Sequence, residues 1–200
     1  MVLSKELKSK KSGVVGLSTV TDPYQPIEEK YRLTRYCLEQ LLRYDFPVHI
    51  QTKSDMVVRD IDLISKFSDI EVMFSIGTLS DSERKYLEPN ASPIKNRLDA
   101  MRKISDTGIK TSVFFGPIYP TVKLNDIPEI IDAFMQHGAN EIMVDKLNLK
   151  PGIVENLDYI FEGKPGILSK ILGNDDYYKE IRQRISKHCD KNKIKYIDAF

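Results

Sequence analysis

Polar and turn-forming residues follow each of five short apolar runs, and they are the residues most able to do chemistry. They occupy positions 21–25, 52–54, 75–78, 116–120 and 145–148. If the apolar runs are parallel strands, their carboxyl ends meet at one edge of the fold, where ligands usually bind. Lys53, Asp145 and Lys146 lie at the ends of otherwise apolar segments, where a simple strand end needs no charge. We therefore expect a polar site for a small-molecule ligand at this edge.

Cysteine chemistry is sparse, because the chain has two cysteines, Cys37 and Cys189. Cys37 lies in a helical pattern, where a thiol commonly packs as a small hydrophobe. Cys189 follows His188 on a polar helical stretch, which suggests a surface position. Neither cysteine has a CxxC or CxxxC partner, so the sequence predicts no metal site.

The elements that would position the polar residues alternate along the chain. Strands are expected at 14–20, 47–53, 70–77, 109–118 and 140–149, with a short last strand within 193–200, because these runs are β-branched or aromatic. Helical patterns cover 28–44, 93–107, 125–137 and 175–190. Ser92 is expected as an N-cap with Pro93 at the first helical position, and Gly108 and Gly138 as stops.

This alternation predicts an α/β fold with parallel strands and right-handed crossovers. Five or six βα units are fewer than the eight of a closed barrel, which needs about 250 residues. The pattern alone leaves open a partial barrel or a doubly wound open sheet. We expect a single domain over residues 1–200, with an irregular insertion at 150–172 near the strand ends.

Composition and charge restrict the partners. The chain is 41% hydrophobic and 30% charged, with a net charge of +1. Near-zero charge argues against nucleic acid as a partner, since phosphate binding needs clustered Lys and Arg. No apolar run approaches the roughly 20 residues of a membrane helix, and the lysine-rich N-terminus is not a secretory signal. Together with the low cysteine content, this predicts a cytoplasmic location.

Several segments in order carry a family resemblance. They are TDPYQPIE, TKSDMVVRD, SIGT, LEPNASPIKNRL, GIKTSVFFGPIYP and GANEI, between about residues 3 and 150. TDPYQPIE and EPxASPxxxRL are the specific parts. In this order the sequence resembles radical S-adenosylmethionine proteins of the spore photoproduct lyase-like group. The resemblance implies a partial, TIM-like (β/α) barrel that holds S-adenosylmethionine against a 4Fe–4S cluster, where the sulfonium is cleaved to a deoxyadenosyl radical.

The resemblance also assigns cofactor-binding residues. It implies that Thr21 and Asp22 lie near the methionine amino group, and that Lys53 and Ser75 contact the methionyl carboxylate and the ribose. Arg97 is a second candidate for the carboxylate, because a guanidinium can pair with it bidentately; the alternative is an exposed helix arginine. The backbone at Gly116 and Pro117 is expected to lie against the adenine. No catalytic residue is assigned.

Two departures from the family limit these implications. A radical enzyme of this kind carries CxxxCxxC after its first strand, and this chain has no such loop. We interpret the first βα unit, with its cluster loop, as missing: lost, carried by another chain, or encoded upstream. As this chain alone, the protein is then expected to be unable to do radical chemistry. The residues ahead of Thr21 also lack the thiol that spore photoproduct lyase uses as a hydrogen donor, which argues against thymine dimer repair.

Two other function classes stay open. Lys53 or Lys146 at a strand end could form a Schiff base with a carbonyl substrate, as in aldolase-type barrels. A non-catalytic module that binds S-adenosylmethionine or another nucleotide, or a protein partner, is the other alternative. An uncovered sheet edge beside the cleft would favour a homo-oligomer or a cluster-bearing partner chain.

Overall fold

One six-stranded sheet with strands in sequential order, β1 to β6, organises the molecule. The computed structural model describes residues 2–11, 13–17, 20–148, 153, 157 and 176–199. Every neighbouring pair of strands is parallel. The strands are β1 (Val15–Leu17), β2 (Val48–Thr52), β3 (Ile70–Ser75), β4 (Lys110–Ile118), β5 (Glu141–Lys146) and β6 (Lys195–Asp198). A doubly wound sheet reverses its strand order at a switch point, so the sequential order excludes that alternative.

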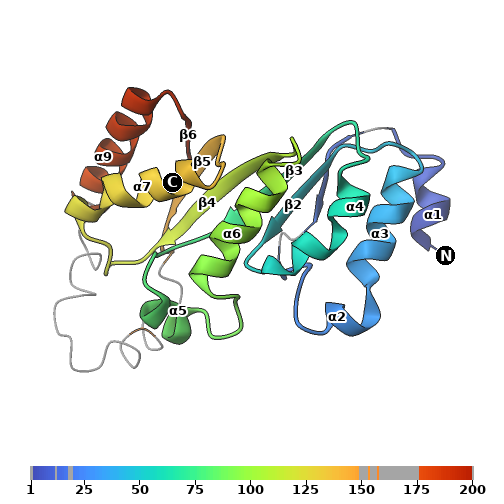
Figure 1. The fold of residues 1–200 in the computed structure, drawn as a ribbon, viewed down its shortest axis with the longest axis horizontal. Helices are drawn as coiled ribbons and strands as arrows, with labels where there is room; N and C mark the ends of the chain where they lie inside the picture. Colours follow the sequence, from blue (N-terminus) through green and yellow to red (C-terminus); the bar gives the residue numbers. More distant parts are fainter. Residues whose placement is uncertain are drawn as a thin grey trace.

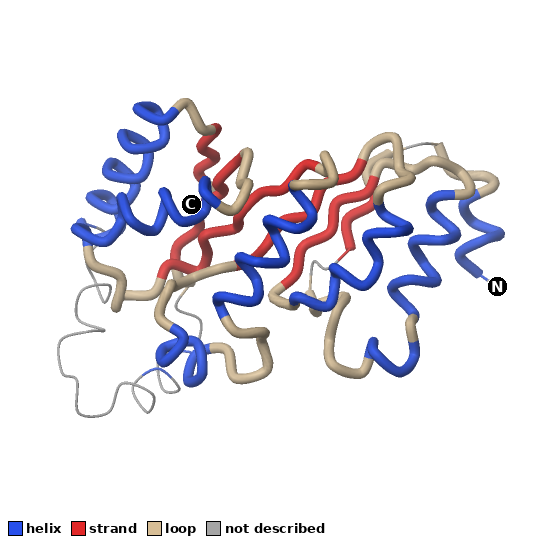
Figure 2. Tube along the Cα trace, in the orientation of Figure 1, coloured by secondary structure: helices blue, strands red, loops and turns tan. Residues whose placement is uncertain are grey.

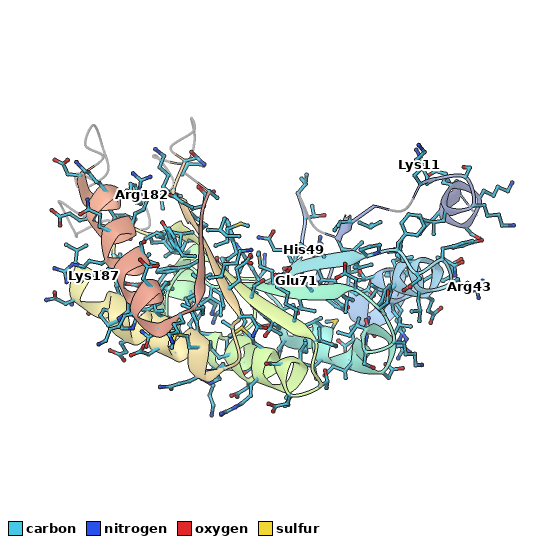
Figure 3. All side chains as sticks on the ribbon, turned by 90° about the horizontal axis from the view of Figure 1, so that it is seen from above. Lys11, Arg43, His49, Glu71, Arg182 and Lys187 are labelled. Carbon is cyan, nitrogen blue, oxygen red and sulfur yellow. The ribbon has the colours of Figure 1, made fainter. Side chains whose placement is uncertain are left out.

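The helices that alternate with the strands lie on one face of the sheet (Figures 1 and 2). Seen from above, the sheet curves around an open face that the helices leave uncovered (Figure 3). The fold is therefore the expected partial barrel. Its helices are α1 (Val2–Leu7), α2 (Glu28–Tyr31), α3 (Leu33–Leu42), α4 (Ile61–Ile64), α5 (Asp81–Leu87), α6 (Ile94–Ser105), α7 (Ile127–Gln136) and α9 (Asp176–Asn192), with 3-10 turns η1 (Asp55–Asp60) and η2 (Leu124–Asp126).

The core lies between the helices and the convex face of the sheet. Alternate strand residues point into it, as the period of two in a strand requires. They meet the apolar stripes of the helices. The fully buried members include Ile50, Val72, Val113, Ile142 and Val144 from strands, and Leu38, Met101, Ile131 and Phe134 from helices.

Two predicted helices differ in detail from the structure. The helix expected over 28–44 is broken at Arg32, whose φ of 52° is left-handed, so α2 and α3 are separate. Pro93, and not Ser92, is the N-cap residue of α6. The Ser92 hydroxyl instead donates to Asp55 Oδ1 at 2.6 Å. Gly108 and Gly138 follow their helices with φ of 83° and 94°, as expected for helix stops.

The pattern missed two helical segments, and the predicted surface position of Cys189 is wrong. Residues 55–64 form η1 and α4, and residues 81–87 form α5. Both segments begin after a serine that caps the first turn: Ser54 Oγ accepts from Met56 N, and Ser80 Oγ from Glu83 N. Cys189 is fully buried and not on the surface. The predicted insertion at 150–172 lies outside the described residues, apart from positions 153 and 157.

Candidate functional site

The loop after β1 is fastened to the end of β2 by one carboxylate. Asp22 accepts hydrogen bonds from Tyr24 N at 2.8 Å, from Thr52 Oγ1 at 2.7 Å and from Lys53 N at 2.6 Å. Two of these donors are backbone amides, so the geometry depends on the chain path as well as on side chains. Asp22 therefore fixes the ends of two neighbouring strands at the same edge of the sheet.

A second carboxylate, Glu88, meets two cationic side chains and one hydroxyl from three other segments. It follows α5 and is buried. Its Oε1 lies 2.9 Å from Lys53 Nζ at the end of β2, and its Oε2 lies 2.9 Å from Arg97 Nη1 on α6. The hydroxyl of Tyr119, after β4, donates to Oε1 at 3.5 Å. Sequence reasoning did not single out Glu88, although it lies inside the quoted segment LEPNASPIKNRL.

Arg97 is fully buried, so the interpretation as an exposed helix arginine is wrong. Besides Glu88, its guanidinium donates to Ser75 O and to Ser92 O, both at 2.8 Å. These acceptors belong to the protein, and Arg97 is not among the described residues that line the cavities at the strand ends. The buried Arg97 Nη2 has no hydrogen-bond partner among the described residues, so one donor of the guanidinium is not used by the protein. A direct contact between Arg97 and a ligand carboxylate stays a prediction.

The segment 88–97 is also tied to the loop after β2. Ser92 N donates to Lys53 O at 3.1 Å, and the Ser92 hydroxyl and Asn96 Nδ2 donate to the Asp55 carboxylate at 2.6 and 2.9 Å. Asp55 N donates back to Ser92 Oγ at 3.1 Å. The two sequence motifs TKSD and EPNASPIKNR thus form one structural unit.

An inner cavity of about 390 Å³ opens at the carboxyl ends of β2, β3 and β4. Five of the seven predicted cofactor-binding residues line it: Asp22, Lys53, Ser75, Gly116 and Pro117. The remaining described lining residues are Val20, Gln51, Thr52 and Phe114. The Ser75 hydroxyl accepts from Gln51 Nε2 at 3.1 Å, so this wall offers a preformed polar pair.

An outer cavity of about 730 Å³ lies beside the inner one, between the loop after β1 and the segment 87–91. Thr21, Asp22 and Lys53 line it, and Asp22 and Lys53 belong to both cavities. The other described lining residues are Tyr24, Gln25, Pro26, Ile27, Ser54, Leu87, Glu88, Pro89, Asn90 and Ala91. Both volumes lie in the range of small-molecule sites. One acid and one base therefore form a wall shared by two adjoining spaces.

Two glycines allow close packing at the inner wall: Gly116 lines the cavity, and Gly77 packs against the Pro117 carbonyl and the Tyr119 ring. A Cβ on Gly116 would lie 2.7 Å from the ring of Phe114, and a Cβ on Gly77 would lie 2.8 Å from the ring of Tyr119. Both distances are closer than packed carbon atoms approach. The backbone can therefore follow this path past the cavity only with glycine at positions 77 and 116.

A third carboxylate, Asp60, forms a closed cluster behind the loop after β1. It is fully buried and accepts from Tyr24 Oη at 3.1 Å, Arg35 Nη1 at 2.9 Å and Arg59 Nη2 at 2.9 Å. Burial raises the pKa of Asp60, but the hydrogen bonds from Arg59 and Arg35 outweigh it and hold the pKa below its ordinary value. Burial, followed by the charge of Asp60, raises the pKa of Tyr24.

A charged row crosses the opposite end of the open face, at the amino ends of the strands. His49 and Glu71 lie side by side there (Figure 3). Lys110 Nζ lies 2.9 Å from Glu71, and Lys195 Nζ lies 2.6 Å from Glu141. Hydrogen bonding from His49, followed by bonds from Ser112 and Lys110, lowers the pKa of Glu71 to about 2. This row lies away from the cavities.

Sequence comparisons identify related proteins. The sequence profile of the Radical SAM superfamily matches residues 3–134. An uncharacterised protein of Methanocaldococcus jannaschii is 37% identical over 150 residues, covering 75% of this chain and 55% of that protein. A radical SAM Nalpha-GlyT isomerase of Pseudomonas phage M6 is 26% identical, covering 68% of this chain and 29% of that protein. The chain thus spans about half the length of the first of these relatives, and less of the second.

Structure comparisons agree on the fold. A spore photoproduct lyase variant superposes with a TM-score of 0.69 at 14% identity, covering 98% of this chain and 64% of that one. Streptococcus suis SuiB bound to S-adenosylmethionine gives a TM-score of 0.65 at 12% identity, covering 94% and 39%. Among the residues that the structure describes, no helix is both long and apolar enough to cross a membrane.

Proposed function

Because the chain belongs to the radical SAM superfamily, we propose that its two adjoining cavities together bind one molecule of S-adenosylmethionine. The observation that carries this proposal is the shared wall of Asp22 and Lys53. The methionyl end of the ligand carries an ammonium and a carboxylate on one carbon. An acid and a base side by side on one wall complement that pair of charges.

Lys53 is proposed to bind the ligand carboxylate and Asp22 the ligand ammonium. The Lys53 ammonium has three donors, and Glu88 accepts one of them, so others can reach a ligand carboxylate. A carboxylate offers about four acceptor positions. Asp22 uses three of them within the protein, which leaves capacity for a ligand ammonium beside Thr21. The adenosyl end would enter the inner cavity, with the ribose at Ser75 and the adenine along the backbone of Gly116 and Pro117.

The residues present do not fit a 4Fe–4S cluster. Such a cluster takes three or four thiolates, and this chain has two cysteines. Cys37 lies on α3 and Cys189 on α9, two helices that lie far apart along the molecule (Figure 1). Burial raises the pKa of both thiols, that of Cys189 to about 11, which disfavours the thiolate that binds iron. The described residues contain no group of three or more His, Cys, Asp or Glu able to hold a metal ion.

We propose that the chain by itself binds S-adenosylmethionine without cleaving it reductively. Radical chemistry would then require a cluster supplied by another segment or by a partner chain. A cytoplasmic location and self-association belong to the same proposal and await localisation and light-scattering measurements. No lyase activity is assigned, since the sequence ahead of Thr21 has no cysteine to donate hydrogen.

Isothermal titration calorimetry with S-adenosylmethionine tests the binding proposal. We expect saturable heat with one ligand per chain, lost or much reduced in Lys53→Met and retained in Glu71→Gln, a variant of the remote charged row. No heat from the folded wild-type chain would refute the proposal. In a second experiment, dithionite and S-adenosylmethionine are added to the protein, and chromatography should detect no 5′-deoxyadenosine.

The Schiff-base alternative finds less support at Lys53. Its amine lies 2.9 Å from the Glu88 carboxylate and is engaged in an ion pair. A nucleophilic lysine instead needs a neutral amine next to its carbonyl substrate. Borohydride trapping with small aldehydes should therefore leave Lys53 unmodified, as judged by mass spectrometry of the tryptic peptides; an adduct there would revive the alternative.

A further inference from the structure

The buried carboxylate of Glu88 lines the outer cavity and pairs with Lys53, yet the binding proposed above gives it no contact with the ligand. We propose that Glu88 is a positioning residue: by holding the Lys53 ammonium on the shared wall, it makes the site select nucleosides whose side chain ends in a carboxylate. This inference rests on the proposed binding of S-adenosylmethionine. It adds a reason why the site would discriminate against ligands that differ only in lacking this carboxylate.

Glu88 is itself fixed from the protein side. Its backbone N–H donates to Arg84 O at 2.7 Å at the end of α5. Its Oε2 pairs with Arg97, whose guanidinium is fully buried and donates to Ser75 O and Ser92 O. Tyr119 approaches the other oxygen at 3.5 Å. The carboxylate therefore has little freedom to move when a ligand enters.

Lys53 is the most exposed member of the group. Its side chain is 39% exposed, whereas those of Glu88 and Arg97 are 6% and 0% exposed. A lysine side chain has four rotatable carbons, and ordering it upon binding costs affinity. The ion pair with Glu88 orders it before the ligand arrives. This preorganisation is worth up to about tenfold in binding for one long side chain.

The charges also favour a carboxylate at this position. Arg97 and Lys53 both pair with the single carboxylate of Glu88, while Asp22 beside Lys53 is the acid proposed for the ligand ammonium. Arg97 is buried on the far side of Glu88, so the positive group that faces the cavities is Lys53. A ligand without a carboxylate would leave this ammonium with one partner fewer.

The variant Glu88→Gln tests whether Glu88 positions the Lys53 ammonium or only neutralises its charge. Three donors converge on Glu88, from Lys53, Arg97 and Tyr119. Glutamine has one acceptor oxygen, and its NH₂ group is a further donor. Leaving a buried charge unpaired is costly, so Arg97 should keep the oxygen. Lys53, which can turn toward water, should be released.

The test compares S-adenosylmethionine with decarboxylated S-adenosylmethionine, which keeps the sulfonium, the amine and the nucleoside. Dissociation constants are measured by calorimetry on the full chain. The wild type should prefer the carboxylated ligand. Glu88→Gln should lower this preference by about 2- to 10-fold, and Lys53→Met should abolish it. The double variant should match Lys53→Met alone. Glu71→Gln, which breaks the ion pair with Lys110 at the other end of the strands, is the matched control and should keep the preference.

The possible results separate this inference from the proposed function. If the wild-type chain binds neither ligand, the proposed function fails. If it binds both equally well, or if Glu88→Gln keeps or raises the preference, binding stands and the inference is overturned. An effect of Glu88→Gln that persists in the Lys53→Met background would overturn it too, because Glu88 would not act through Lys53. Should Glu88→Gln fail to fold, Glu88→Asp, which keeps the charge but shortens its reach to Lys53, carries the same prediction.

Discussion

Asp60 and Glu88 are the centres of two clusters with the same chemical parts and different surroundings. Each carboxylate is buried and meets two cationic side chains and one tyrosine hydroxyl. Around Asp60 both cations are arginines, and each has a further carboxylate partner, Asp62 or Glu28. Around Glu88 one cation is Lys53, which lines both cavities.

This difference distinguishes charges that only stabilise the fold from charges that can also bind a ligand. The planar fork of arginine suits fixed multidentate pairing, whereas the lysine ammonium is a point charge on a flexible stem with donors to spare. The cluster of Asp60 supports the loop after β1 from behind. The cluster of Glu88 has the same kind of anchor in Arg97 but presents Lys53 to the open side.

Asp60→Asn should give the largest effect on stability. Asparagine offers one acceptor oxygen to two arginines, which are 24% and 23% exposed and keep Asp62 and Glu28 as partners, so the free energy of unfolding should fall by about 1–3 kcal/mol. Urea denaturation measures the loss. Asp62→Asn is the matched control, because it removes an exposed partner of the same Arg35 and should cost less than about 1 kcal/mol. Equal losses in the two variants would contradict the structural role given to Asp60.

Lys53→Met should change stability little and weaken the binding of S-adenosylmethionine. The methionine keeps much of the apolar stem, so the unfolding free energy should change by less than about 1 kcal/mol, as for partly exposed ion pairs. Affinity for S-adenosylmethionine should fall about 10- to 100-fold, the value of a hydrogen bond to a charged group. Calorimetry and thermal unfolding on the same samples check both values. A large stability loss with unchanged affinity would place Lys53 among the structural charges.

The charged row at the amino ends of the strands predicts an acid dependence that is separate from binding. The folded-state pKa of Glu71 is about 2 against an ordinary value of 4.5. A lowered carboxyl pKa contributes stability that is complete above about pH 4.5 and is lost as the pH falls toward 2. His49, Ser112 and Lys110 supply this contribution, which we expect to reach about 2 kcal/mol after solvent screening. Glu71→Gln should flatten the stability profile in that window, measured by urea titrations at each pH. If stability fell equally in wild type and variant between about pH 4.5 and 2, the charged row would contribute nothing to the stability of the fold.

Removing the two tyrosine hydroxyls should give the smallest effects. Tyr24→Phe removes a donor 3.1 Å from Asp60 and should cost about 1 kcal/mol, while Tyr119→Phe removes one 3.5 Å from Glu88 and should cost about half of that. Thermal unfolding of the two variants side by side measures the difference. A larger loss at Tyr119 would reverse the comparison and make the cluster of Glu88 the more rigid one.

The sequence predicted the sheet well because strand signals are local. Runs such as 70–77 and 109–118 are apolar and β-branched, and all six expected strands form with shortened ends. Four of the five polar strand ends contribute residues to the two cavities, whereas residues 145–148 are not among the described lining residues. Five of the seven predicted residues line one cavity. This convergence follows from parallel strands alone.

The rest of the site depends on contacts between distant segments, which no local pattern encodes. Glu88 meets Lys53 across 35 positions and Tyr119 across 31. Arg97 lies three residues after Ile94 and four before Met101, on the buried stripe of α6, so its spacing is that of a core residue and only its charge favoured exposure. Its partners come from distant segments: Glu88, the Ser75 carbonyl at the end of β3 and the Ser92 carbonyl. Arg32 adopts a left-handed backbone that its residue type does not predict, which splits one expected helix into two.

A crystal structure of this chain grown with S-adenosylmethionine tests the central claim most directly. We predict the adenosyl group in the inner cavity beside Ser75, Gly116 and Pro117, and the methionyl carboxylate within hydrogen-bonding distance of Lys53 Nζ, with Glu88 still paired to that lysine. Ligand density elsewhere on the molecule, or a methionyl group in these cavities that turns its carboxylate away from Lys53, would contradict the account.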